Sequence, residues 1–186
     1  MKLSKQFIYL FIVAFLTGCG PSFTLVKDER INISKRYSVQ PGMDWSQLKR
    51  ESVTYWTADG LMLDEIVFLE SIQDGKTFFG DEKSNPFKSN MSEIEIAELF
   101  IESLKINGQW SNGKYKELKL QKFGSFDGFN FGISLVNKDG LAYKGLASGA
   151  IIEKELHIIF FLATEFHYYD KFKNNFLAIV SSIQKT

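Results

Sequence analysis

Four Asp-Gly pairs divide the chain, and they constrain its fold more than any other feature. Three of the four lie between runs in which apolar and polar residues alternate, and the pairs are Asp59-Gly60, Asp74-Gly75, Asp127-Gly128 and Asp139-Gly140. Asp-Gly between alternating runs is the strongest short-range signal for a β-hairpin, because Gly readily adopts the left-handed conformation that tight turns need. The sequence therefore predicts antiparallel strands joined by short turns.

The turn at Asn137 to Gly140 also predicts a register, in which Asn137 faces Leu141. When this register is extended away from the turn, large side chains face aromatic or small ones on the neighbouring strand. The predicted pairs are Leu135 with Tyr143, Ile133 with Gly145 and Phe131 with Ala147. The opposite face of this hairpin is polar or small, with Asn130, Gly132, Ser134, Lys144 and Ser148. We expect that face to be solvated or closely approached by another element. The same counting at the other turns predicts three further pairs, which are Trp56 with Met62, Tyr55 with Leu63 and Phe123 with Phe131.

Other segments predict a central strand and two main helices. The run Leu156 to Ala163 is almost entirely apolar, as in a strand covered on both faces. A helix begins at Ser92, where Glu95 completes a capping box, and ends near Asn107. A second helix runs from about Tyr168 to Ile183, with the apolar stripe Phe172, Phe176, Ile179, Val180 and Ile183. A shorter helix is expected over 44–50, with Trp45 and Leu48 turned inward, and a long polar loop over 74–91.

This order of elements predicts an α+β domain with an antiparallel sheet of about six to seven strands flanked by two main helices. The chain resembles the PsbP-like α-β-α sandwich, in particular a family of uncharacterised lipoproteins with this fold. The resemblance rests on Trp56-Thr57-Ala58-Asp59-Gly60-Leu61, on the Phe123 to Phe131 hairpin, and on the helix after His167-Tyr168-Tyr169. It implies a fold whose members are mostly accessory or binding proteins, and it transfers no functional residue.

The N-terminus has the pattern of a secretory signal. Lys2 and Lys5 precede an apolar run over 7–16, which is followed by Thr17, Gly18 and Cys19. About ten apolar residues are too few for a transmembrane helix, which needs roughly 20.

Leu16-Thr17-Gly18-Cys19 resembles the lipobox of bacterial lipoprotein precursors. The resemblance implies cleavage between Gly18 and Cys19, a diacylglycerol on Cys19, and a further acyl chain such as palmitate on the new amino group. Two or more chains anchor firmly, since each buried methylene contributes about 0.8 kcal/mol. The alternative is an ordinary secreted protein with a coincidental cysteine at the cleavage point.

The anchor predicts three segments, which are a signal peptide over 1–18, a lipidated tether over 19–30, and a single domain over 31–186. The expected location is the cell envelope. The residue after Cys19 is Gly20 and not Asp, which in a Gram-negative organism favours the periplasmic face of the outer membrane. Losing Lys2 and Lys5 changes the balance of 22 basic and 22 acidic residues to 20 against 22. That charge argues against a nucleic-acid-binding protein.

Motifs for catalysis are missing from the sequence. His157 and His167 are the only histidines, and neither has a second ligand at metal-site spacing. Ser148 is fourth, not third, in Gly145 to Gly149, so the nucleophile-elbow pattern fails, and two Ser-x-x-Lys matches (46–49 and 182–185) lack companion motifs. Asp64 and Glu65 fall on opposite faces of a strand. The sequence predicts no catalytic residue, no metal site and no cofactor, and it favours a protein that is not an enzyme.

Aromatic side chains offer a candidate ligand groove formed by Trp45, Trp56, Trp110 and Tyr168, with core packing as the alternative. Three functions stay open. The first is a lipid-anchored, non-enzymatic binding or accessory module that engages an envelope protein. The second is an envelope hydrolase with dispersed carboxylates. The third is a carrier of a hydrophobic ligand between the sheet and a helix.

Overall fold

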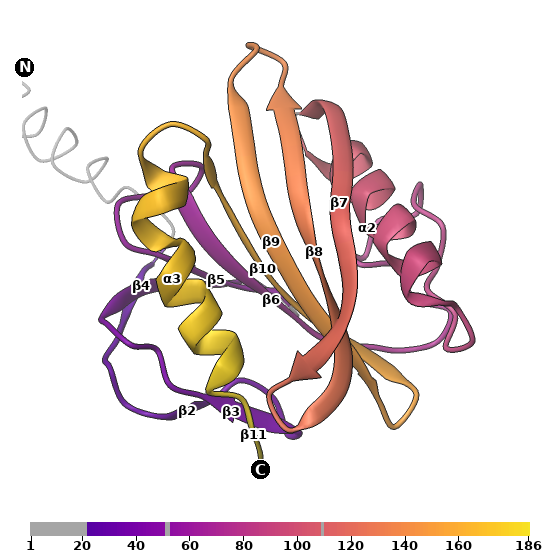
Figure 1. Ribbon diagram of the computed structural model, residues 1–186, viewed down its shortest axis with the longest axis horizontal. Helices are drawn as coiled ribbons and strands as arrows, with labels where there is room; N and C mark the ends of the chain where they lie inside the picture. Colours follow the sequence, from indigo (N-terminus) through magenta and orange to yellow (C-terminus); the bar gives the residue numbers. More distant parts are fainter. Residues whose placement is uncertain (1–21, 51–52, 109) are drawn as a thin grey trace, which may run out of the picture.

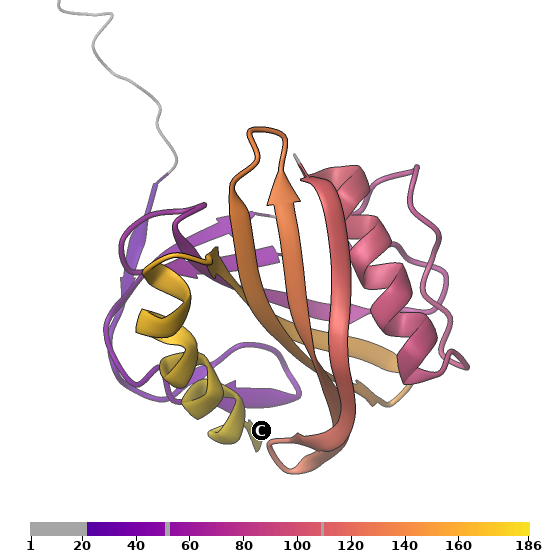
Figure 2. The same ribbon diagram turned by 45° about the horizontal axis from the view of Figure 1, so that its top comes forward.

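The fold is built around one large antiparallel sheet with a helix on each face (Figures 1 and 2). A computed structural model describes residues 22–50, 53–108 and 110–186. In these ranges the sheet has eight strands, in the order β1 (Thr24–Val26), β4 (Trp45–Arg50), β5 (Val53–Thr57), β6 (Asp64–Ile72), β10 (Glu155–Thr164), β9 (Ala142–Ile152), β8 (Phe126–Asn137) and β7 (Trp110–Phe123). The helices are α2 (Glu93–Asn107) and α3 (Tyr168–Ser181).

A smaller sheet packs beside α3 and contains β11 (Gln184–Lys185), β3 (Tyr37–Val39) and β2 (Ile31–Asn32). The α+β class, the antiparallel pairing and the two main helices are confirmed. The main sheet has eight strands where six to seven were predicted, because β1, with three residues, is too short to show a periodicity in sequence and β4 lies where a short helix was predicted. Neither described helix is long and apolar enough to cross a membrane.

The β8–β9 hairpin has the predicted register. Leu135 faces Tyr143, Ile133 faces Gly145 and Phe131 faces Ala147. At the turn, the Asn137 N–H donates to the Leu141 carbonyl at 3.0 Å, and the Leu141 N–H donates to the Asn137 side chain at 2.8 Å. Gly145 is required here for a second reason, since a Cβ at this position would lie 2.2 Å from the Phe161 carbonyl oxygen of β10.

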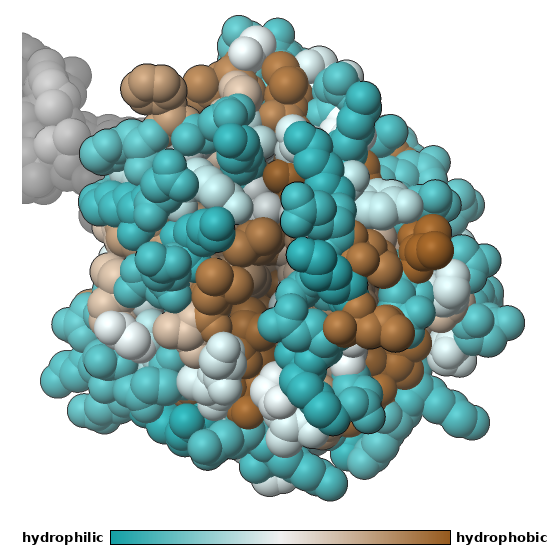
Figure 3. All heavy atoms as spheres, viewed as in Figure 1, coloured by the Kyte–Doolittle hydropathy of each residue, from teal (hydrophilic) through white to brown (hydrophobic). Residues whose placement is uncertain are grey.

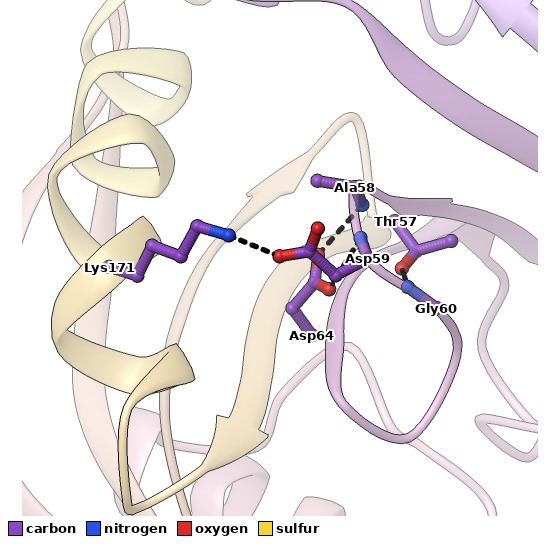
Figure 4. A network of polar contacts seen from close by, with 6 residues as sticks. All are labelled: Thr57, Ala58, Asp59, Gly60, Asp64 and Lys171. Atoms are coloured by element: carbon purple, nitrogen blue, oxygen red, sulfur yellow. Dashed lines mark hydrogen bonds and ion pairs between the residues drawn. The ribbon is translucent and has the colours of Figure 1, made fainter.

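The register predicted for the β5–β6 hairpin is wrong. Trp56 faces Ile66 and not Met62, so the connection is four residues longer than a tight turn. Asp64 causes the difference (Figure 4), because its fully buried carboxylate accepts the N–H of Ala58 at 2.8 Å and that of Asp59 at 2.9 Å. These bonds satisfy the backbone of a wide loop, and the loop is also joined to α3 by the ion pair between Asp59 and Lys171. Tyr55 accordingly faces Val67 and not Leu63.

The β7–β8 hairpin turns at Gly124 and Ser125, and not at Ser125 to Gly128 as predicted. Phe123 faces Phe126, not Phe131, and Gly124 takes the left-handed conformation with φ of +58°. The Asp127-Gly128 pair therefore lies inside β8. Gly128 serves a close approach between strands, since a Cβ there would lie 2.3 Å from the carbonyl oxygen of Gly149.

The helix predicted over 44–50 is wrong, because residues 45–50 form strand β4. Trp45 and Leu48 are both buried, but Trp45 belongs to the core under α3 whereas Leu48 lines a hollow on the opposite face of the sheet, which a strand permits and one helical stripe does not. The tether expected over 19–30 also differs in its second half. Thr24 to Val26 pair with β4 as β1, and Asp44 then accepts the backbone N–H of Asp28 at 3.0 Å. Residues 1–18 and Cys19 lie outside the described residues.

Both helices begin where predicted. The capping box is present, with the Ser92 N–H donating to Glu95 at 2.8 Å and the Glu95 N–H donating to the Ser92 hydroxyl at 3.4 Å. The apolar stripe of α3 is buried as predicted, and Ile183 stays in the core although the helix ends at Ser181. The loop over 74–91 is packed onto α2, because Phe78 and Phe87 are buried in the same core.

The two helices are offset across the sheet, and this offset creates its open surfaces. On one face α2 packs against β7 and β8, and on the other face α3 packs against β10, β9 and β6. The strand β10 is consequently covered on both faces, as its apolar sequence predicted. The part of each face beyond its helix is covered by loops, by the small sheet, or by solvent, and hollows occur on both faces.

Candidate binding groove

A groove lies between α3 and the exposed face of β7, β8 and β9. It has a cavity volume of about 440 Å³ and is bounded by α3 on one side and by β7 on the other. Its central lining is the polar or small face of the β8–β9 hairpin, including Asn130, Gly132, Ser134, Lys144 and Ser148. The sequence predicted that this face is solvated or approached by another element. Both alternatives are correct, because α3 approaches one side of this face and the rest of the face is open to solvent.

Apolar side chains line the part of the groove next to α3. Leu146 reaches it from β9, and three side chains reach it from α3, which are Phe176, Leu177 and Val180. Phe176 and Val180 also belong to the core under α3, whereas Leu177 lies off the buried stripe and is 40% exposed. In the view of Figure 3, apolar side chains form a strip between α3 and the hydrophilic side chains of β7. The groove therefore offers exposed apolar surface enclosed by polar side chains.

Five lysines and one glutamate line the same groove, and two further carboxylates, Asp127 and Glu165, pair with two of these lysines, so the net charge is positive. The cations are Lys116, Lys119, Lys122, Lys144 and Lys173. Three of them have a carboxylate partner, with Lys119 at 3.5 Å from Glu117, Lys122 at 2.5 Å from Asp127, and Lys144 at 2.7 Å from Glu165. The hydrogen bond from Lys144 to Glu165 raises the pKa of Lys144, which keeps this ammonium charged. Lys116 and Lys173 make no ion pair within the described ranges, and they stand on opposite sides of the groove.

A β-bulge shapes the outer wall. The pairing of β7 with β8 shifts between Lys116 and Lys119, and Glu117 takes a φ of +51°. A bulge inserts an extra residue, bends the strand and redirects its side chains, and bulges are frequent next to binding sites. Both lysines that border the bulge line the groove.

The four aromatic residues of the predicted ligand groove do not line one groove, because three belong to the core under α3 and Trp110 lies on the other face of the sheet. Trp45 and Trp56 are 1% and 0% exposed, and they pack in the core under α3 against Phe172 and Phe68. Tyr168 lies at the edge of that core. Trp110 lies on the other face, with its ring 4.9 Å from that of Tyr143. The alternative prediction, core packing, is correct for Trp45 and Trp56, because β4 and β5 direct these side chains toward α3.

The histidines and Ser148 serve the fold. His157 is fully buried, its Nδ1 accepts the Ser71 N–H at 3.3 Å, and burial lowers its pKa. His167 immediately precedes α3 with its ring against Tyr168. The Ser148 hydroxyl points at the Phe129 carbonyl at 3.4 Å. Within the described part of the chain, no group of three or more His, Cys, Asp or Glu side chains could hold a metal ion.

Asp64 and Glu65 face opposite sides of β6, as predicted. Asp64 holds the loop described above, and its burial raises its pKa although the two backbone N–H groups oppose that shift. Glu65 lines a hollow on the α2 face, where Asp139 also contributes. A hydrolase would require such a pair to act together on one bond, and that hypothesis stays a prediction.

The sequence analysis placed Lys144 on the polar face of the β8–β9 hairpin, but it missed the other four groove lysines, although a signal was present. Lysine occurs at 114, 116, 119 and 122 within one predicted strand region, and Leu177 is a large apolar residue outside the stripe of the last helix. Either observation alone is typical of a solvated surface. Their meeting depends on the offset of α3, which no local pattern reveals.

Comparison with known proteins supports the fold alone. No protein-family model matches the sequence, and no curated protein matches it either. Among solved structures, the chain is similar to the cyanobacterial PsbP protein CyanoP from Synechocystis sp. PCC 6803, with a TM-score of 0.58 and 13% identity over 92% of this chain and 99% of that one. The domain thus has a PsbP-like fold, which confirms the resemblance at the level of architecture.

A second structure, LpqN of Mycobacterium tuberculosis, is described as involved in cell envelope biogenesis. It is 10% identical, the match covers 91% of this chain and 87% of that chain, and the TM-score is 0.40, too low to support an argument about this protein.

Proposed function

We propose that the protein is a lipid-anchored binding module of the bacterial cell envelope, and that its groove between α3 and β7–β9 binds an anionic amphiphile. The observation that carries this proposal is the combination of exposed apolar surface with five lysines, of which Lys116 and Lys173 make no ion pair within the described residues. The lipobox pattern at Leu16 to Cys19 supports the anchored location. The function is binding without catalysis.

The dimensions of the groove favour a small amphiphile over a protein segment. Small-molecule sites are typically about 300–1,000 Å³, and a volume of about 440 Å³ falls in that range. A stable protein interface usually buries about 800 Å² on each partner, much more than this hollow offers. An acyl chain would lie on Leu146 and Leu177, and a phosphate would lie near Lys116 and Lys173.

The test compares two short-chain lipids that dissolve as monomers. The full lipidated chain, purified in a non-ionic detergent, is titrated with dihexanoyl phosphatidic acid and with dihexanoyl phosphatidylcholine. We expect the anionic lipid to bind at least about tenfold more tightly, since charge-assisted hydrogen bonds to ammonium groups contribute about 1.5–3 kcal/mol. The double variant Lys116→Glu/Lys173→Glu should remove this preference.

Lys35→Glu/Lys105→Glu is the matched control, because it makes the same change of net charge at two lysines outside the groove. Thermal unfolding of both double variants checks that the fold is retained. Equal binding of the two lipids by the native chain would refute the proposal. So would a preference that survives the groove variant or disappears in the control.

A further inference from the structure

A second hollow lies on the other face of the sheet, beside the C-terminal end of α2. It has a cavity volume of about 740 Å³ and lies where β4, β5 and β6 extend beyond the helix. Five aromatic side chains contribute to its walls, which are Tyr55, Phe79, Trp110, Tyr143 and Phe160. Leu104 and Leu162 add apolar surface from α2 and β10. The hollow is separate from the groove, because the sheet lies between them.

One carboxylate, that of Glu65, lines this aromatic pocket from within the sheet. Glu65 is on the same face of β6 as Val67 and Leu69, which are fully buried in the α2 core. Within the described residues it has no ion pair. Burial raises the pKa of Glu65 to about 7, and the nearby N–H of Met62 offsets this only in part. The cost of removing the Glu65 carboxylate from water is therefore offset only in part by protein groups, and a bound cation would stabilise its charged form.

Two other charged groups line the pocket, and both are exposed. Arg50 comes from the end of β4 and Asp139 from the β8–β9 turn. Tyr55 and Tyr143 are the remaining titratable groups of the lining, and burial raises the pKa of each, so they stay neutral. The partly buried charge in the apolar interior is thus negative, whereas the opposite charges of Arg50 and Asp139 are in solvent.

We infer that this pocket binds a hydrophobic ammonium compound, with its apolar body against the aromatic walls and its cationic group at the Glu65 carboxylate. Aromatic faces attract cations through the ring quadrupole, and the attraction grows when water is excluded. A carboxylate among aromatic rings therefore selects an ammonium group over a neutral polar group of the same size. The inference goes beyond the proposed function, since it concerns a different site and a ligand of opposite charge.

The test uses 4-phenylbutylammonium and its neutral analogue 4-phenylbutanol as probes of the full lipidated chain in non-ionic detergent. Binding is followed by tryptophan fluorescence, because Trp110 lines the pocket whereas Trp45 and Trp56 are buried in the other core. At pH 8 we expect the ammonium to bind at least about tenfold more tightly than the alcohol, as a partly desolvated charge pair and the aromatic walls together allow. Glu65→Gln should make the two affinities equal, and Glu117→Gln, which removes an exposed carboxylate from the groove, should preserve the difference.

A pH series on the native chain gives a test that does not depend on the folding of a variant. Protonation of Glu65 below about pH 7 removes the charge, so the preference for the ammonium should fall toward one as the pH is lowered well below that value. Equal binding of the two probes at pH 8, a preference that persists in acid, or one that survives Glu65→Gln would overturn the inference. None of these results bears on the lysine-lined groove, whose test uses anionic lipids.

Discussion

Cells that produce the Cys19→Ala variant should incorporate no labelled palmitate into this protein, whereas the native chain should be labelled. Cys19 is the only cysteine, so no other thiol can carry a thioether-linked diacylglycerol. The intact mass of the native protein should lack residues 1–18 and include the added lipid. Because two or more acyl chains hold a protein firmly and a bare domain has none, the expected difference in membrane retention is essentially complete.

A second variant separates anchorage from secretion. The chain from Gly20 onward, placed behind an ordinary secretory signal without a cysteine, should be recovered in the soluble fraction. Recovery of labelled Cys19→Ala protein, or membrane retention of the second variant equal to that of the native chain, would contradict the lipoprotein hypothesis. The ordinary secreted protein with a coincidental cysteine would then be the better description.

Asp64→Ala should destabilise the domain by about 2–4 kcal/mol, because it leaves two backbone N–H groups of the β5–β6 loop without their acceptor. Those groups belong to Ala58 and Asp59, and the carboxylate that satisfies them is fully buried. Asp64→Asn retains one of the two acceptor oxygens and should have an intermediate effect. The measurement is the free energy of unfolding from denaturant titration, with all variants at one pH.

Asp59→Ala is the matched control, since it removes the other carboxylate of the same network (Figure 4). Its partner is Lys171, and the side chains of Lys171 and Asp59 are 44% and 37% exposed. Exposed ion pairs contribute about 0–1 kcal/mol, so this variant should unfold close to the native chain. If the two alanine variants were equally destabilised, the wide loop would not depend on the buried carboxylate.

The three predicted hairpins show what local sequence could and could not determine. The β8–β9 register was predictable because Asn137 and Gly140 fill a tight turn and no other residue competes for its backbone. The register predicted for the β5–β6 hairpin was wrong because Asp64, several residues after the Asp-Gly pair, accepts hydrogen bonds that support a wider loop. The Asp127-Gly128 pair also predicted a turn at a position that lies inside β8. Gly128 is required there because the neighbouring strand β9 approaches too closely for a Cβ, and not because the chain turns.

The candidate sites were less predictable than the fold because each is formed by elements distant in sequence. The groove joins lysines of β7 to Leu177 of α3, and the second pocket joins Glu65 of β6 to Trp110. Periodicity correctly assigned the two main helices and the central strand, but it does not determine how far along the sheet a helix lies. The offset of α2 and α3 leaves a hollow on each face, and the residues around each hollow determine the chemistry that we propose.

The central proposal is that the groove holds an anionic amphiphile of the membrane to which we expect Cys19 to anchor the protein. The most direct test places a photo-cross-linking amino acid at Leu177, which is exposed and lines the groove, in cells that make the full chain. Ile94 on α2 is also exposed and lies outside the groove, so it is the control position. Irradiation followed by mass spectrometry should give an anionic lipid adduct at 177 and none at 94. A protein adduct at 177, or equal lipid labelling at both positions, would contradict the account.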